Sequence, residues 1–265
     1  MTLAAGRVEY TLGATPVTGC GLSWTGTELD TALEGSVAEV LFDDAGANDC
    51  AALLESVIGT EFDQSAVKQV LENKNVPEDW RVGEALAEAY LVSHRTCRFP
   101  WPDGRDERRS GSSLPGADLV GFQRDGTTDR FAFGEVKTSN EGKYPPGTMY
   151  GRTGLKQQIE DLRDNISIRD GLVKYLWYRA VNAPWKAQFL CAYRRYNASN
   201  TDVQLFGFLV RDVSPHKDDL RVRVSELGKN CPAVMSIELL AIYLPADNIQ
   251  TLSQKVMNSR KGSGT

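Results

Sequence analysis

The chain has 265 residues, of which 41% are hydrophobic and 25% are charged, so it can bury a substantial core and does not have the composition of a disordered protein. Its net charge of −5 argues against a large non-specific surface for nucleic acid, because neutralised phosphates supply most of that affinity. The N-terminus lacks the apolar run of a signal peptide and no stretch is long enough to cross a bilayer, so we expect a cytoplasmic protein with no membrane partner.

The cysteines and histidines argue against several further classes of enzyme. The five cysteines are scattered without a Cys-x-x-Cys pair, so we expect reduced and mostly buried thiols. Only His94 and His216 are present, without metal-ligand spacing, which argues against a zinc hydrolase or a His-Asn-His nuclease. Phosphate-binding and Gly-x-Ser-x-Gly motifs are also missing, so nucleotide-driven enzymes and triad hydrolases have little support.

Residues 1–76 mix short apolar runs with Gly and Thr, and helical periodicity follows at residues 51–58 and 65–72. This segment contains no catalytic cluster. We therefore expect an N-terminal α+β extension that packs on the next domain or contacts a partner. Residues 77–258 are predicted to form the main domain, and residues 259–265 a flexible tail.

A helix is predicted from Asp79, the expected N-cap, to about His94. Glu84 and Glu88 lie one turn apart on the same side of this helix. One of them is a candidate to face a site formed later in the chain, and Glu84 is preferred. A solvated glutamate face is the alternative interpretation for each.

Residues 117–122 and 131–137 form two predicted strands of a hairpin, and Gly126 in the turn between them can adopt a positive φ. Because alternate side chains of a strand share a face, Glu135 and Lys137 project together. The hairpin can place Asp118 beside Glu135. Asp103, which follows Pro102, lies in a predicted loop and is a weaker candidate.

Two adjacent carboxylates repel each other unless a cation lies between them, and oxygen ligands suit Mg²⁺ or Mn²⁺. We therefore predict a metal site at Asp118 and Glu135, with the carbonyl of Val136 as a further ligand. Such an ion activates phosphodiesters towards hydrolysis, and Lys137 is placed to orient the attacking water. The alternative is an ordinary strand face with a surface ion pair, since Glu-x-Lys also occurs at residues 72–74 and 141–143.

The second half of the chain continues the alternation of helices and strands. A loop at residues 138–153 flanks the hairpin, and Leu155, Ile159, Leu162 and Ile166 indicate a helix. Gln158 on this helix is a weak candidate for the site. Strands predicted at residues 187–193, 203–210 and 234–244 complete a mixed sheet, and a helix is predicted at residues 247–258.

The order of helix, Asp-bearing strand, Glu-x-Lys strand and Gln-bearing helix resembles the PD-(D/E)xK nucleases, which have the restriction-endonuclease-like fold. More narrowly, Gly-Ala-Asp-Leu-Val-Gly at residues 116–121 and Gly-Glu-Val-Lys-Thr at residues 134–138 resemble the HamA nuclease subunits (DUF1837) of Hachiman antiphage defence. The resemblance implies an α/β core with a mixed central sheet flanked by helices. It also implies metal-dependent DNA cleavage, and a superfamily 2 helicase partner that restrains the nuclease.

Three other functions stay open at this point. A site-specific restriction endonuclease acting as a homodimer has the same motif. A catalytically inactive DNA-binding subunit has the same fold, although the intact Asp118, Glu135 and Lys137 argue against it. An RNase is also compatible, because chemistry centred on the phosphate does not read the sugar.

Overall fold

The computed structural model describes residues 3–44, 46, 48–49, 52, 76–102, 105–106 and 116–262. The helix predicted at residues 65–72, most of the one at residues 51–58, and Asp103 lie outside the described residues.

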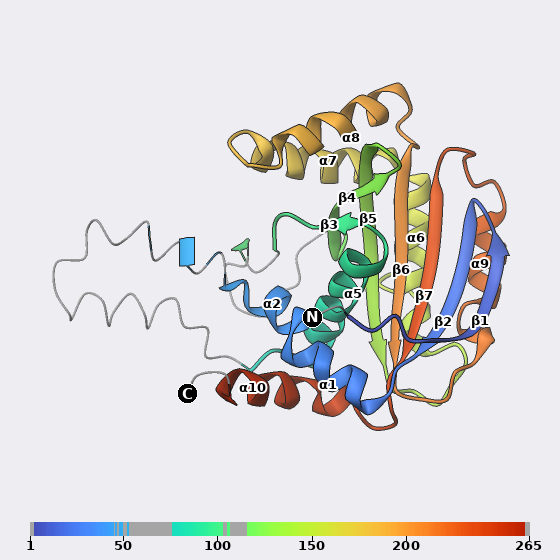
Figure 1. Ribbon diagram of the computed structural model, residues 1–265. Coiled ribbons are helices and arrows are strands. Elements are labelled where there is room, and N and C mark those ends of the chain that lie inside the picture. Colours follow the sequence, from blue (N-terminus) through green and yellow to red (C-terminus); the bar gives the residue numbers. More distant parts are fainter. Residues whose placement is uncertain are drawn as a thin grey trace.

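One seven-stranded mixed sheet runs through the molecule in the order β1-β2-β7-β6-β5-β4-β3 (Figure 1). Its strands are β1 (Arg7–Ala14), β2 (Val17–Ser23), β3 (Cys97–Arg98), β4 (Leu119–Asp125), β5 (Thr128–Ser139), β6 (Val203–Arg211) and β7 (Ser236–Tyr243). β2, β7, β6 and β5 pair in parallel, whereas β1 with β2 and β3 and β5 with β4 pair antiparallel. The predicted α/β class with a mixed central sheet is confirmed.

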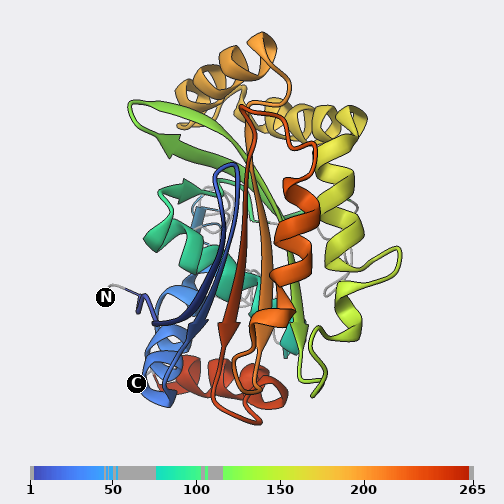
Figure 2. The ribbon, with the colours of Figure 1, turned by 90° about the vertical axis from the view of Figure 1, so that its right-hand side faces the viewer.

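Helices cover both faces of the sheet (Figures 1 and 2). One face carries α1 (Gly26–Glu34), α2 (Ser36–Phe42), α5 (Asp79–His94) and α10 (Leu252–Gly262). The other carries α6 (Leu155–Asp164), α7 (Ile166–Ala180), α8 (Lys186–Ala198) and α9 (Arg221–Gly228). Short 3-10 turns are η2 (Gly147–Met149), η3 (Lys217–Asp219) and η4 (Ile249–Thr251). No described helix combines the length and the apolar character needed to span a bilayer.

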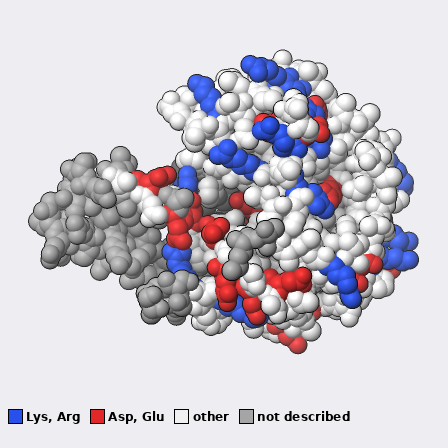
Figure 3. Space-filling view, viewed as in Figure 1, with Lys and Arg blue, Asp and Glu red and all other residues white. Residues whose placement is uncertain are grey.

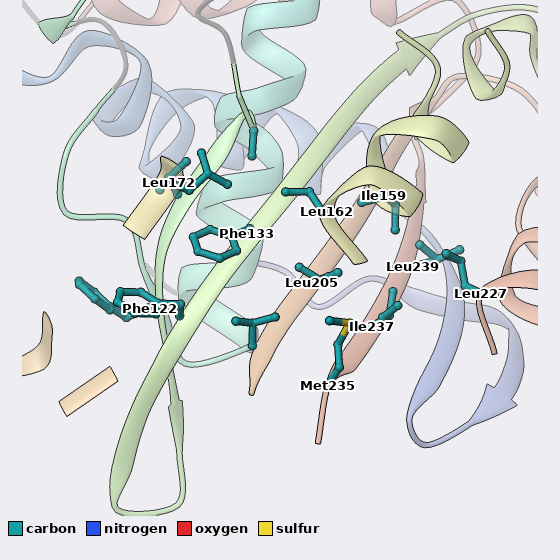
Figure 4. Packing of buried hydrophobic residues seen from close by; sticks show 14 of the residues in the cluster. Phe122, Phe133, Ile159, Leu162, Leu172, Leu205, Leu227, Met235, Ile237 and Leu239 are labelled. Carbon is teal, nitrogen blue, oxygen red and sulfur yellow. The ribbon is translucent and has the colours of Figure 1, made fainter. Parts of the chain in front are cut away.

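The alternation of side chains along β5 divides the core into two clusters. Phe131 and Phe133 are buried on the side of α6 to α9, where Phe133 lies near Ile159 and Leu162 of α6 (Figure 4). Ala132 and Val136 are buried on the other side, in the cluster that contains α5. Glu135 and Lys137 lie two and four residues after Phe133 in β5. Because alternate side chains of a strand share a face, they face the α6 side of the sheet, as Phe133 does.

The described part of the predicted N-terminal extension is continuous with the rest of the fold. β2 pairs in parallel with β7, from Val17 opposite Ile237 to Ser23 opposite Tyr243. α1 begins with a capping box in which Thr25 and Glu28 satisfy each other's backbone N–H groups, and its buried side chains join the α5 cluster. The extension therefore shares both a sheet and a core with residues 77–258.

Several predicted elements need correction. The strand predicted at residues 187–193 is wrong, because this segment is part of α8. Its buried residues Phe189, Ala192 and Tyr196 recur at a helical spacing, and that period outweighs the β-favouring residue types. The single helix expected after Leu155 is interrupted at Asn165, whose side chain caps α7. α10 extends to Gly262, into the predicted tail. The helix of residues 79–94 and the strands β6 and β7 are confirmed, but the N-cap of the helix is Glu78 and not Asp79.

Candidate active site

The β4–β5 hairpin places Asp118 opposite Glu135. Asp125 pairs with Thr128 across a two-residue turn in which Gly126 has a φ of 60°, so the backbone there needs a glycine. The register then runs to the last pair, Leu119 with Gly134. Asp118 lies one residue before β4, next to Glu135 and on the same side of the sheet.

Asp118, Glu135 and Lys137 form a compact cluster. The Nζ of Lys137 is 3.4 Å from Oε2 of Glu135 and 3.8 Å from Oδ2 of Asp118. The side chain of Glu135 is only 2% exposed, whereas those of Asp118 and Lys137 are 18% and 19% exposed. The cluster is therefore buried at Glu135 and open to solvent at the other two residues.

Burial dominates the electrostatics of this cluster. Loss of hydration and, to a smaller extent, the negative charge of Asp118 together raise the pKa of Glu135 to about 9, although Lys137 acts against the shift. Glu135 therefore keeps a proton at neutral pH unless additional positive charge is present. A divalent cation between the two carboxylates would supply that charge.

The backbone N–H group of Val136 is directed towards Asp118. It donates a 2.7 Å hydrogen bond to Oδ2 of Asp118. In a strand the N–H and C=O of one residue point to the same edge, so the Val136 carbonyl also faces the Asp118 side. This residue lies beyond the last β4 pair. This orientation is compatible with the prediction that the Val136 carbonyl oxygen is a metal ligand.

α6 lies directly over this part of the sheet. Glu135 pairs with Gly207 of β6, and a Cβ at Gly207 would lie 3.4 Å from Cγ1 of Ile159 and 2.5 Å from Cδ2 of Leu239. The absence of a side chain at Gly207 lets α6 approach the strand beside Glu135. Sequence reasoning missed Gly207; its position inside a strongly apolar strand is the signal of close packing.

Gln158 precedes Ile159 on α6. Its Oε1 atom is buried and has no hydrogen-bond partner among the described residues. A buried amide oxygen without a partner is costly, so its presence on the helix that covers the cluster favours a ligand or water at this position.

The assignment of Glu84 and Glu88 to the site stays a prediction. Both are on α5, which packs against the opposite face of the sheet from Glu135 and Lys137. The contact is close at Gly83, where a Cβ would overlap the hydroxyl of Thr138. Glu84 accepts a 3.0 Å hydrogen bond from Nη1 of Arg81. Side chains alternate along β5, so Thr138 faces α5 whereas Lys137 faces the other side of the sheet.

The donor set fits a magnesium-type ion. The two carboxylates and the Val136 carbonyl offer oxygen atoms only, and Mg²⁺ is commonly held by one or two carboxylates together with waters and substrate phosphates. Within the described ranges no three His, Cys, Asp or Glu side chains are arranged to hold a metal ion. The residues therefore fit a site that substrate completes, and they do not resemble a zinc centre.

Comparison with models of known protein families gives no match for this chain. Comparison with curated proteins gives none either. The assignment of a function therefore depends on the geometry around Asp118, Glu135 and Lys137.

Proposed function

We propose that the chain is a Mg²⁺- or Mn²⁺-dependent nuclease that hydrolyses phosphodiester bonds in DNA. The observation that carries this proposal is the convergence of Asp118, Glu135 and Lys137 from adjacent strands, with Glu135 buried beside a second carboxylate. An ordinary exposed strand face would leave Glu135 in water. Its burial next to like charge is the arrangement expected of a functional site.

The order of elements supports the finer proposal of a restriction-endonuclease-like fold. α5 precedes three antiparallel strands, β3, β4 and β5, and α6 begins the crossover to β6, which is parallel to β5. This succession matches the nuclease core that the sequence resembles, with the acidic residues at the corresponding strands.

Each residue has a distinct role in this proposal. Asp118, Glu135 and the carbonyl of Val136 would hold the ion, which when bound polarises the phosphate and lowers the pKa of a coordinated water. Lys137 lies within 4 Å of both carboxylates and is partly open to solvent, so its ammonium group can donate to the attacking water. The same charge offsets the negative charge that develops on the phosphate. The amide of Gln158 orients a water or a phosphate oxygen.

We extend the proposal to a role as the effector of an antiphage defence system, held in check by a superfamily 2 helicase. The resemblance to HamA subunits and the net charge of −5, which disfavours unaided binding to DNA, support this extension. A helicase encoded beside this gene should suppress cleavage by the purified nuclease until damaged or phage DNA is added. Cleavage that the helicase leaves unchanged would count against it.

The direct test is digestion of supercoiled plasmid with Mg²⁺. We expect Glu135→Ala and Lys137→Ala to slow cleavage by about 100-fold or more, and EDTA to abolish it. Lys143→Ala is the matched control, because it removes the exposed lysine of the Glu-x-Lys copy in the loop after β5 and should leave the rate unchanged.

The outcomes of this digestion separate the alternatives. Equal loss of DNA with all four proteins would indicate a contaminating nuclease and remove the support for the proposal. Discrete bands from a defined duplex would favour a site-specific restriction endonuclease. Parallel digestion of RNA of the same sequence decides between a DNase and an RNase, and no cleavage by the wild type would favour an inactive binding subunit.

A further inference from the structure

The α7–α8 segment has a charge opposite to that of the whole chain. Residues 166–200 contain six Lys and Arg and a single acid, Asp170, for a net charge of +5 in a chain whose total is −5. Arg179 and Arg195 pair with acids of neighbouring segments, but Lys174, Lys186 and Arg194 are exposed. In Figure 3 Lys and Arg gather over the end of the molecule where Figure 1 shows α7 and α8.

A groove of about 850 Å³ runs along α7 and the C-terminal end of α8. Trp177 and Tyr178 line it and are 54% and 71% exposed, unusually high values for large aromatic side chains. Tyr193 of α8 also lines it, and its ring centroid is 5.9 Å from that of Trp177. Flat aromatic faces from two helices are thus open to a ligand.

Polar groups accompany these rings. Lys174 lines the groove, with its Nζ 5.9 Å from the ring centroid of Tyr178. Asp170, the one acid among the described residues of the lining, accepts a 2.7 Å hydrogen bond from the hydroxyl of Tyr196. Asn197 and Asn200 add amides at one end. The groove therefore combines aromatic faces, a cation and amide groups.

α7 also adjoins the candidate active site. A Cβ at Gly116, two residues before Asp118, would lie 3.1 Å from Cδ2 of Leu172 on the buried side of α7. One side of this helix thus packs against the segment that carries Asp118, and another side faces the groove. A ligand in the groove would lie on a helix that flanks the cluster.

We infer that the groove between α7 and α8 binds unpaired nucleotides of a single-stranded nucleic acid. Trp177 and Tyr178 stack on bases, and Lys174 contacts a phosphate. Aromatic platforms combined with cations are the usual means of binding single strands without sequence preference. A protein partner would also use aromatic residues, but the net positive charge of residues 166–200 favours a polyanion. The inference rests on the proposed nuclease function, because it names unpaired strands as the substrate delivered to that site.

The test is fluorescence anisotropy of a labelled oligothymidylate with the full chain in EDTA, where no cleavage occurs. Trp177→Ala and Tyr178→Ala should each weaken binding roughly 5-fold or more, since stacking contributes about 1–3 kcal/mol per base. Tyr150→Ala, which removes another exposed aromatic ring, is the matched control and should bind as the wild type does. Both variants in the groove change exposed side chains, and circular dichroism spectra verify that they fold.

Charge is tested separately. Lys174→Glu should weaken binding and reduce the salt dependence by about one phosphate contact, whereas Lys217→Glu, an equal change at an exposed position of η3, should have a much smaller effect. An oligouridylate probe shows whether the groove distinguishes RNA from DNA. Duplex DNA should bind more weakly than either single strand.

Other results overturn the inference. Wild-type affinity in both Trp177→Ala and Tyr178→Ala would show that the groove does not bind the strand. If these variants instead abolish self-association in sedimentation experiments, the occupant is a protein. Single-strand binding without any cleavage by the wild type would contradict the proposed nuclease function but support the binding of single strands in the groove. Failure of the nuclease proposal can therefore be distinguished from failure of the groove proposal.

Discussion

Glu135 illustrates how one residue can be unfavourable for the fold and useful for the chemistry. Its carboxyl group is buried next to Asp118, and this position raises its pKa to about 9. Between its ordinary pKa of 4.5 and this value, the folded protein holds a proton that the unfolded chain releases. Stability therefore falls as the pH rises through this window, and the loss is absent below it.

The first prediction concerns Glu135→Gln. Glutamine cannot ionise, so the variant should match the wild type in melting temperature near pH 4.5 and exceed it at pH 8.5 in EDTA. We expect a gain of about 1–3 kcal/mol at the higher pH, or several degrees. Calorimetry at both pH values measures it, with Glu34→Gln as the exposed control. A constant difference between wild type and variant at all pH values would contradict the assigned burial.

The second prediction concerns the proton on Glu135. Binding of Mn²⁺ or Mg²⁺ requires the carboxylate, so the ion should displace this proton at pH 7 to 8. Titration calorimetry in two buffers with different ionisation enthalpies should show up to one proton released per ion. Glu135→Gln should release none, and equal heats for the wild type in both buffers would refute the site.

The third prediction concerns Gln158. Its Oε1 atom is buried without a partner among the described residues, so Gln158→Met removes a desolvated polar group. We expect the metal-free protein to be unchanged in stability or more stable by up to ~1 kcal/mol, and plasmid cleavage to become slower. Thermal melts and cleavage rates measured on the same sample check this. A clear loss of stability would mean that the amide already has a partner.

At the scale of elements, glycines set how closely helices approach the sheet. The lack of a side chain at Gly207 lets α6 pack closely on the face of the sheet that carries Glu135. The lack of one at Gly83 lets α5 pack closely against Thr138 on the other face. The relative position of α6 and β5 therefore depends on a residue that carries no chemistry. Small changes at Gly207 should shift the covering helix before they affect the cluster itself.

The fourth prediction compares two glycines. Gly207→Ala forces contacts with Leu239 and Ile159, so it should destabilise the protein by roughly 1–3 kcal/mol and slow cleavage. Gly171→Ala, in α7 with open space around the added methyl group, should stabilise the protein by about 0.5–1 kcal/mol. Urea denaturation of both variants measures the difference. Similar effects of the two substitutions would show that α6 is not held close at Gly207.

At the scale of the whole molecule, the N-terminal strands β1 and β2 extend the sheet at one edge. β2 pairs with β7 from Ile237 to Tyr243, and α1 and α2 pack on the same core as α5. The boundary at residue 76 that the sequence suggests divides a continuous sheet and a continuous core. Independent folding of the two parts is not expected from this packing.

The fifth prediction follows from this continuity. Without residues 1–76 the chain exposes the edge of β7 and the buried surface around Leu22, Trp24 and Leu29, so it should aggregate or lose its cooperative melt. Near-ultraviolet circular dichroism and ANS binding measure the loss. Co-expression of residues 1–76 as a separate chain should restore it in part. A truncated chain that melts like the intact protein would show that the main domain is independent.

The sequence alone was enough to predict the elements that depend on local interactions. The β4–β5 hairpin and its register follow from alternating residues and one glycine turn within about twenty residues, so the convergence of Asp118, Glu135 and Lys137 could be expected. The sequence predicts a strand at residues 187–193 because aromatic residues favour strands, whereas the structure has the helix α8, whose buried residues Phe189, Ala192 and Tyr196 recur at a helical spacing.

Only the tertiary structure decided which elements surround the cluster. The face of the sheet on which α5 packs depends on contacts between helix and sheet that no local pattern records. The same holds for Gly207 beside Glu135 and for β2 beside β7, more than two hundred residues away in the chain. Such pairings arise from the burial of complete faces, so they belong to the assembled core and not to any one segment.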